Sequence, residues 1–375
     1  MFNECRLIWK SIECFTAMIN KHEIPFEYSD YVLRAKFREI ATRQNWLHSG
    51  KIILAVSGGG DSTALAWFFH KYYDGEFMIA HVNHNLRGED AERDEAFVKN
   101  LASEMQVEFA AKKVSVGENI LPGESVESAG RRIRHSVLVE FAKNSGVRYV
   151  ALAHNRDDLA ETVLFNILRG SGIRGSVGIP EISEFSGVKF FRPLMAFRRE
   201  FLREFLRVRG LSWREDVSNQ DSKYTRNFLR LELLPLIAKN INSNAIEHLA
   251  EFAEDMRPVR ESEESRSYEL LERVKIHEAN ATEHLAEFAG DMRPVRHEAG
   301  LKLDAKKLRK IPEPDLKLII RKLGRNLNLQ TLSRNRCNEL SRLLAKSEPF
   351  VFQWSGAAKL ESKGGVLSVT IGENS

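Results

Sequence analysis

The sequence predicts an α/β fold, in which a doubly wound parallel-sheet domain is followed by a helical domain and a small C-terminal β segment. Short apolar runs alternate with helical patterns between residues 49 and 169, which is typical of a sheet covered by helices on both faces. After Pro235 the chain becomes helical and highly charged, and near residue 349 it returns to a β pattern. A length of 375 residues also favours two or three domains.

Local patterns predict each element of the first domain. The expected strands are 51–56, 77–82, 109–114 and 149–153, and the expected helices are 61–73, 89–105, 125–145 and 157–169. In open parallel sheets ligands bind at the carboxyl ends of the strands. The predicted domains are an amphipathic helical extension of unclear role at 1–48, the α/β domain at 49–235, and a helical domain at 236–375 that ends in a β-hairpin or small sheet.

Composition narrows the class of protein. The formal net charge is only +4, from 56 basic and 52 acidic residues, so any surface for nucleic acid must be local. Cys5, Cys14 and Cys337 form no CxxC pair, which fits a reducing compartment and argues against zinc or an Fe–S cluster. We find no signal-peptide pattern and no run long enough to span a membrane, and we expect a soluble, cytoplasmic protein without a membrane partner.

A glycine-rich turn follows the first expected strand directly, with the sequence Ser57-Gly58-Gly59-Gly60-Asp61-Ser62. Its glycines let phosphate groups approach the backbone, and the amides at the start of the next helix attract anions. Asp61 would repel bare phosphate, which implies a bridging divalent cation, most simply Mg²⁺. The turn lacks the lysine of a Walker P-loop. An ordinary glycine-rich turn is the structural alternative to this polyphosphate site, and His81 ends the second strand at the same sheet edge.

A polar cluster comprising His154, Asp157, Asp158 and Glu161 follows the fourth expected strand. Helical spacing places His154 near Asp158, and Asp158 near Glu161. Acidic residues in a first turn also serve as helix caps, which is the structural alternative. Because this cluster should face the glycine-rich turn across the sheet edge, its carboxylates could hold Mg²⁺ or bind a cationic amine and act as a base toward it.

Two groups of arginines are candidates for binding phosphate or RNA. Arg131 and Arg134 lie one turn apart and, taken alone, form a solvated helix face; beside a phosphate site they would neutralise its charge. Arg199, Arg203 and Arg207 form a basic stripe at four-residue spacing. Neighbouring glutamates can pair with the stripe, so a plain surface helix fits as well as an RNA-binding one.

The segment after the stripe mixes cations, amides and an aromatic residue. Asn219, Arg226 and Asn227 are its candidate substrate-binding residues, because such mixed donors suit a nucleotide contact. Further on, residues 247–260 recur almost unchanged as residues 283–296. We expect each copy to be an amphipathic helix, the first ending at Pro258, and assign the repeat no function.

Taken together, these segments resemble the tRNA(Ile)-lysidine synthetase family of PP-loop ATP pyrophosphatases, from about Lys51 to Pro235. The resemblance is carried by the glycine-rich turn and, in order, by residues 80–87, 127–134, 153–162, 168–172, 192–194, 216–219 and 226–235. Three positions depart from the family pattern. Gly60 stands where a larger residue is usual, Asn155 where a histidine is frequent and His135 where tyrosine is common.

The resemblance implies an enzyme, a ligase that forms a carbon–nitrogen bond in two steps. ATP first adenylates the carbonyl oxygen at carbon 2 of the wobble cytidine in tRNA(Ile) with a CAU anticodon, and pyrophosphate is released. The ε-amine of L-lysine then attacks that carbon and AMP leaves. The product, lysidine, lets the tRNA read AUA codons and accept isoleucine.

The resemblance also implies roles for residues of this chain. The turn Ser57–Ser62, His81 and Arg131 would bind ATP, with Asp61 and Asp158 on Mg²⁺. The catalytic set would be Asp61, His154, Asp157, Asp158 and Glu161, and the choice between base and metal ligand stays open. The substrate-binding set would be Arg134, Arg199, Arg203, Arg207, Asn219, Arg226 and Asn227.

Three rival functions remain. A tRNA 2-thiolase shares the loop but generally needs paired cysteines for sulfur delivery. A nucleotide or amide synthetase of the same superfamily would usually bring an ammonia-generating domain. A non-catalytic tRNA-binding protein with a relic loop is disfavoured by the intact Asp61, His154, Asp158 and Glu161. The oligomeric state stays open, with a homodimer among the options.

Overall fold

The computed structural model describes residues 25–84, 89–121, 124–215, 225–275, 301–327, 329, 331–346, 348–355 and 358–371. The chain forms two compact units. The first takes in the chain up to Arg169 together with Gly178–Ala250, and the second takes in Gly170–Val177 and Glu251–Ser375. The second copy of the repeat and Asn219 lie outside the described residues.

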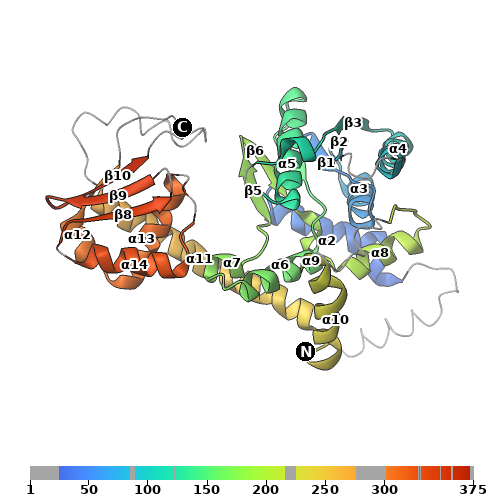
Figure 1. The fold of residues 1–375 in the computed structure, drawn as a ribbon. Helices are drawn as coiled ribbons and strands as arrows, with labels where there is room; N and C mark the ends of the chain where they lie inside the picture. Colours follow the sequence, from blue (N-terminus) through green and yellow to red (C-terminus); the bar gives the residue numbers. More distant parts are fainter. Residues whose placement is uncertain are drawn as a thin grey trace. The chain divides into compact units, whose positions relative to one another are not determined.

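A six-stranded sheet forms the centre of the first unit (Figure 1), in the order β3-β2-β1-β4-β6-β5. Its strands are β1 Ile52–Ala55, β2 Phe77–Asn83, β3 Glu108–Lys113, β4 Tyr149–Ala151, β5 Ile182–Phe185 and β6 Val188–Phe191. All neighbouring pairs are parallel except β5 and β6. The predicted parallel sheet is confirmed. The β5–β6 hairpin was not predicted; it turns through Ser186 and Gly187, both at positive φ.

Helices cover both faces of this sheet. They are α2 Asp30–Arg43, α3 Gly60–Tyr72, α4 Glu89–Glu104, α5 Val126–Asn144, α6 Arg156–Leu168 and α8 Arg199–Val208. Side chains alternate along β1, so that Ile52 and Leu54 join the aromatic-rich core beneath α2, α3 and α8. Ile53 points the other way, into a second core that includes Leu138 of α5.

The described part of the N-terminal segment belongs to the α/β core. Helix α2 buries Leu33, Phe37, Ile40 and Ala41. The Phe37 ring meets Phe69 of α3 edge-on, with ring centroids 5.1 Å apart. The role of this helix is therefore structural, which its amphipathic pattern alone did not show.

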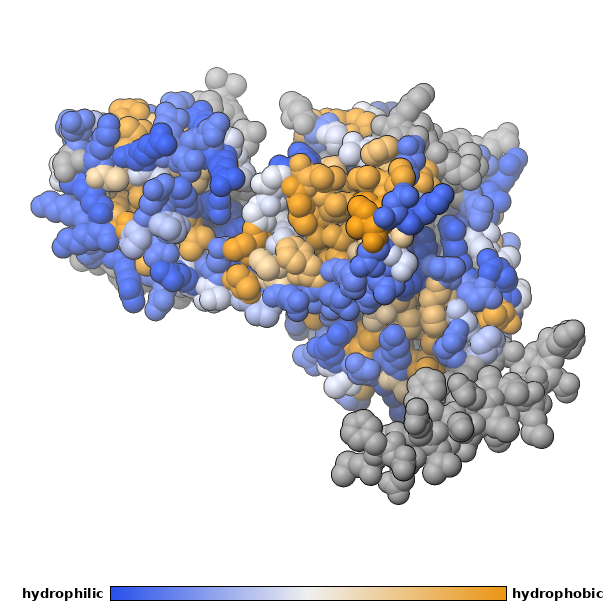
Figure 2. All heavy atoms as spheres, turned by 90° about the horizontal axis from the view of Figure 1, so that it is seen from below, coloured by the Kyte–Doolittle hydropathy of each residue, from blue (hydrophilic) through white to orange (hydrophobic). Residues whose placement is uncertain are grey.

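The first unit continues through short helical segments: α9 Thr225–Phe228, a π-helical turn η5 at Leu229–Leu233, and α10 Leu234–Asn240. Short 3₁₀ turns lie at Phe26–Tyr28, Gly117–Asn119 and Pro193–Ala196. Of α10 only Leu234 is buried, whereas Leu236 is 56% exposed. Figure 2 shows apolar side chains gathered among hydrophilic ones on the face seen from below. Within the described part of the chain, no helix combines the length and apolarity needed to cross a membrane.

The second unit combines helices with a four-stranded antiparallel sheet, ordered β7-β10-β9-β8. Its elements are α7 Ile173–Ser176, most of α11 Ala245–Val274, β7 Lys302–Asp304, α12 Ala305–Arg309, α13 Glu313–Asn326, α14 Arg334–Ala345, β8 Phe350–Ser355, β9 Ala358–Lys363 and β10 Val366–Ile371. The closing β segment is thus a small sheet. Residues such as Ile320, Leu340 and Trp354 form its core.

Helix α11 corrects one expectation. The first copy of the repeat was expected to end its helix at Pro258, but α11 continues through Pro258 to Val274. A proline inside a helix removes one backbone hydrogen bond and crowds the preceding turn. Burial of Leu271 and Val274 in the second core stabilises the continuation and offsets part of that cost.

Candidate active site

A cavity of about 790 Å³ opens at the carboxyl ends of β1, β2 and β4 in the first unit. The glycine-rich turn, residues 80–84 at the end of β2 and residues 152–154 after β4 line it. Arg134, Arg199, Arg203 and Arg230 also contribute to its lining. The expected convergence of loops at this sheet edge is therefore present, because parallel strands end together there.

The glycine-rich turn is held by its own hydroxyls. Ser62 Oγ accepts from the Ser57 amide at 3.1 Å and donates to the Gly59 carbonyl at 2.9 Å. Gly58 has a φ of +95°, a conformation that glycine adopts without strain. Gly59 is the N-cap of α3 and offers no side-chain acceptor, so the amides at this helix start are available to an anion.

His81 lies beneath the turn and is buried. Its Nδ1 is 2.9 Å from the Val56 carbonyl, and because a carbonyl only accepts, Nδ1 carries the proton. The residue also lines the cavity. His81 thus supports the end of β1 beside the cavity.

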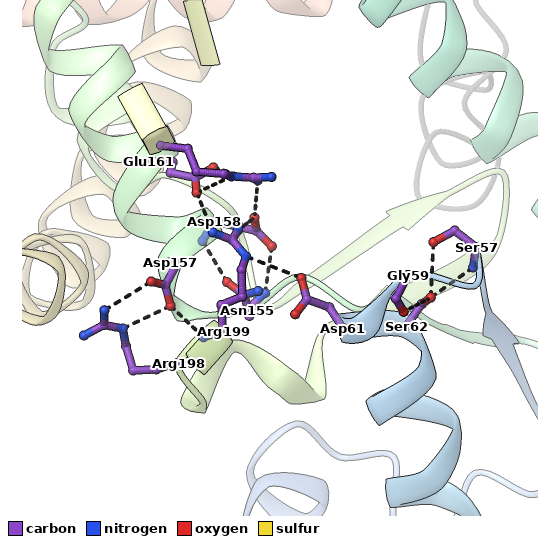
Figure 3. A network of polar contacts seen from close by, with 11 residues as sticks. Ser57, Gly59, Asp61, Ser62, Asn155, Asp157, Asp158, Glu161, Arg198 and Arg199 are labelled. Atoms are coloured by element: carbon purple, nitrogen blue, oxygen red, sulfur yellow. Dashed lines mark hydrogen bonds and ion pairs between the residues drawn. The ribbon is translucent and has the colours of Figure 1, made fainter. Parts of the chain in front are cut away.

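Two arginines bind the predicted carboxylates (Figure 3). Arg199 Nη2 is 2.7 Å from Asp158 Oδ1, and its Nη1 is 3.0 Å from Glu161 Oε1. Arg230 Nε lies 2.8 Å from Glu161 Oε1, and Arg230 Nη2 lies 3.2 Å from Asp158 Oδ1. The Glu161 side chain is only 2% exposed, so its carboxylate is shielded from solvent. Arg199, expected on a surface stripe, therefore lies inside the acidic cluster.

Asp157 has different partners from Asp158. Arg198 donates to both of its oxygens at 3.0 and 3.2 Å, and the Arg199 amide donates to Oδ2 at 2.8 Å. Burial would raise the pKa of the Asp157 carboxyl, but these hydrogen bonds lower it below its ordinary value. Asp157 thus holds the start of α8 and thereby positions Arg199. We propose this positioning role for it in place of direct catalysis.

Asp158 also has the helix-capping role that the sequence offered as the structural alternative. The Asn155 amide donates to Asp158 Oδ2 at 3.0 Å, and the Asp158 amide donates to Asn155 Oδ1 at 2.9 Å. This reciprocal pair is a capping box at the start of α6. Asn155, one of the three departures from the family pattern, is the N-cap.

Asp61 presents an unsatisfied oxygen. Its Oδ1 is buried and has no hydrogen-bond partner among the described residues, while Oδ2 is 3.6 Å from Arg199 Nε. Burial raises the pKa of the Asp61 carboxyl to about 6, although Arg199 acts in the opposite direction. In the described ranges no three His, Cys, Asp or Glu side chains are clustered to hold a metal. Mg²⁺ commonly takes one or two carboxylates together with substrate phosphates, so Asp61 fits such a role.

His154 faces cations rather than carboxylates. Its Nδ1 is buried without a hydrogen-bond partner in the described part of the chain. Burial lowers the pKa of His154 well below its ordinary value, and Arg192 and Arg131 lower it further. The imidazole is therefore neutral at neutral pH and has a ring nitrogen available to a ligand.

The remaining predicted residues are dispersed. Arg203 and Arg134 line the cavity, whereas Arg131 does not appear among its lining residues. Arg207 is 65% exposed and pairs with Glu204. Arg226 of α9 lies 2.8 Å from Glu127 Oε1, and Asn227 follows it in the same helix.

The sequence analysis did not select two groups of residues that line the cavity. Arg230 was noted only as part of the resemblance, although its position four residues after Arg226 suggested the same helix face. Residues 213–215 also line the cavity. These residues pack against a turn about 150 residues earlier in the chain, and no local sequence pattern indicates such a distant contact.

Comparisons with known proteins agree with this fold. The PP-loop domain family matches residues 32–237, and the chain belongs to this family. Curated relatives include the tRNA(Ile)-lysidine synthases of Symbiobacterium thermophilum, 34% identical over 226 residues, and Thermus thermophilus, 41% identical over 208 residues. These matches cover 59% and 54% of this chain, and 47% and 38% of the relatives. A third, from Rhodopirellula baltica, is 38% identical and covers 52% of this chain and 54% of the relative.

The chain thus spans about half or less of the length of these relatives. Among solved structures, a U34-tRNA thiolase from Methanococcus maripaludis aligns with a TM-score of 0.50 over 60% of this chain and 78% of that chain. Its sequence identity is 18%, so this likeness shows the fold alone.

Proposed function

We propose that the protein ligates L-lysine to carbon 2 of the wobble cytidine in tRNA(Ile) with a CAU anticodon, using ATP. One observation carries the proposal: the glycine turn with Asp61 lines the same cavity as Arg199 and Arg230, and these two arginines bind the carboxylates of Asp158 and Glu161. Adenylation needs the glycine turn and capture of a cationic amine needs the carboxylates. The similarity to tRNA(Ile)-lysidine synthases supports the tRNA substrate.

In the first step the glycine turn binds the departing pyrophosphate. The amides at the start of α3 donate toward the charge that develops on it, and the hydrogen-bonded hydroxyls of Ser57 and Ser62 hold the turn in place. Asp61 would hold Mg²⁺ through its unpartnered oxygen, and a bound Mg²⁺ neutralises phosphate charge. Asp158 is the weaker candidate ligand, because both of its oxygens already accept hydrogen bonds.

In the second step the lysine amine must enter the site and lose a proton. Among the acidic residues Asp61, Asp158 and Glu161, Asp61 has the fewest ion-pair contacts: its Oδ1 has no hydrogen-bond partner among the described residues, and its Oδ2 lies 3.6 Å from Arg199 Nε. A carboxylate with a free oxygen can attract a cationic amine and take its proton. A neutral His154 does not repel the ammonium group, and its Nδ1 can accept a hydrogen bond.

The tRNA is proposed to contact basic groups near the cavity and on the second unit. Arg134, Arg203, Arg207, Arg226, Asn227 and Asn219 are the candidates in the first unit. Residues 301–371 contain fifteen Lys or Arg and six Asp or Glu, which gives the second unit a local positive charge. These substrates place the reaction in the cytoplasm.

Incubation with ATP, Mg²⁺, labelled lysine and unmodified tRNA(Ile) transcript tests the proposal. We expect label in the CAU transcript and none in a matched transcript whose wobble cytidine is replaced by uridine. Pyrophosphate release without label in the tRNA would mean that the enzyme adenylates for a different acceptor. Equal labelling of both transcripts would refute the assignment to the wobble base.

A further inference from the structure

Residues 213–215, which we call the strap, lie against the glycine turn although they come 150 residues later in the chain. The Arg214 amide donates to the Gly58 carbonyl at 2.9 Å, and Gly59 and Arg214 form a parallel β-bridge. The strap and the glycine turn therefore share backbone hydrogen bonding, outside the main sheet.

Side chains of the strap pack on the glycines themselves. A Cβ placed on Gly60 would lie 3.4 Å from Trp213 Cδ1 and 3.5 Å from its Nε1. A Cβ on Gly58 would lie 3.7 Å from Arg214 Cγ. The Trp213 indole thus packs directly over Gly60, and it also packs against the aromatic-rich core.

An ion pair holds the strap from outside. Arg214 Nε is 3.0 Å from Asp94 Oδ1 on α4, with the two side chains 38% and 23% exposed. The glycine turn is therefore enclosed on one side by the strap, and the strap is anchored to a helix of the main domain. Glycine-rich turns have many accessible conformations, so external contacts are needed to restrict them.

We propose that Trp213 and Arg214 are positioning residues that hold the glycine turn in its phosphate-binding conformation. This inference rests on the proposed use of ATP. Neither side chain transfers a proton or a group; each acts through the orientation of the loop amides. Loss of the indole would let Gly59 and Gly60 leave the geometry that aims the α3 amides at phosphate, and small displacements of binding groups have large effects.

The test compares ATP affinity in Trp213→Ala, Trp213→Phe and a matched control, Trp67→Ala. Trp67 packs partly buried against the same core but is not among the residues that line the cavity. We expect Trp213→Ala to raise the Kd for Mg²⁺–ATP and the KM for ATP about tenfold, with the KM for lysine within about twofold. Trp213→Phe should restore most of the ATP affinity, and Trp67→Ala should lower Tm while leaving that affinity unchanged.

The Arg214→Ala variant provides a second test. The Arg214 side chain is partly exposed, and its removal leaves the backbone bridge between Gly59 and residue 214 intact. We expect Arg214→Ala, Asp94→Ala and the double variant to weaken ATP binding equally, since each variant breaks the same ion pair between Arg214 and Asp94. Unchanged ATP affinity in both Trp213→Ala and Arg214→Ala would overturn the proposal, as would an equal loss in Trp67→Ala. Direct ATP binding separates the two hypotheses: a protein that binds ATP but ligates no lysine contradicts the proposed function and still tests the strap.

Discussion

Replacing Asp61 by asparagine should stabilise the folded protein while it abolishes activity. The pKa of the Asp61 carboxyl is raised from 3.8 to about 6, chiefly by burial. Because one pKa unit corresponds to about 1.36 kcal/mol, ionising this carboxyl in the folded protein costs about 3 kcal/mol. Asparagine keeps the shape without the charge, and Arg199 keeps its bonds to Asp158 and Glu161.

The pH dependence of this effect follows from the direction of the shift. A raised carboxyl pKa means that the folded protein retains a proton that the unfolded chain has lost. The wild type therefore loses stability as the pH rises from about 4 to 6, and the loss is complete above that range. Asp61→Asn should not show this loss.

Urea unfolding of both proteins between pH 4 and pH 8 measures the difference. We expect the variant to gain little at pH 4 and up to about 3 kcal/mol at pH 7. Mg²⁺–ATP should raise the Tm of the wild type far more than that of the variant, because Asp61 is the proposed metal ligand. A variant that is less stable at pH 7, or whose gain is independent of pH, would refute the reasoning.

Three further predictions concern the ion-pair network, the N-terminal helix and the RNA surface. Arg199→Ala should cost up to about 3–5 kcal/mol in urea unfolding at neutral pH, because it removes the ion pair of Asp61 and leaves Asp158 and the buried Glu161 with Arg230 alone, and a cost below 1 kcal/mol would contradict a buried network. Phe37→Ala should cost about 3–5 kcal/mol by the same measurement, since its ring is fully buried; an unaffected protein would show that α2 is not part of the core. Arg203→Ala and Arg207→Ala should each weaken tRNA binding and reduce the slope of log K against log salt by about one, whereas an unchanged slope would identify a solvated helix face.

Much of the first unit could be predicted from local pattern. The four strands β1–β4 and the helices that follow them lie where apolar runs and helical periodicity placed them. Helix α2 was assigned to an extension, because its apolar stripe does not say which surface will cover it. The β5–β6 hairpin has four-residue strands, too short for a clear alternation.

The site residues likewise divide into those that local sequence predicts and those that depend on tertiary packing. The glycine turn was identifiable because its anion-binding property is local, belonging to a few glycines and the helix that follows. The four-residue spacing of Arg199, Arg203 and Arg207 correctly predicted that they lie on one face of a helix. The environments of the three side chains nevertheless differ. Arg199 is 15% exposed among carboxylates, while Arg207 is 65% exposed. Periodicity reports neighbours within a helix, and it does not report what other elements pack against it.

By itself, the sequence determined the fold class, the glycine-rich turn between the first strand and its helix, and the presence of carboxylates at the same sheet edge, because each depends on contacts within a few residues or on strand order. The tertiary structure alone decided that Arg199 joins Glu161, 38 residues away in the chain, and that Asp157 anchors a helix. It also placed Trp213 on Gly60. Such contacts depend on how separate elements pack, and the free energy that selects them is spread over the whole core.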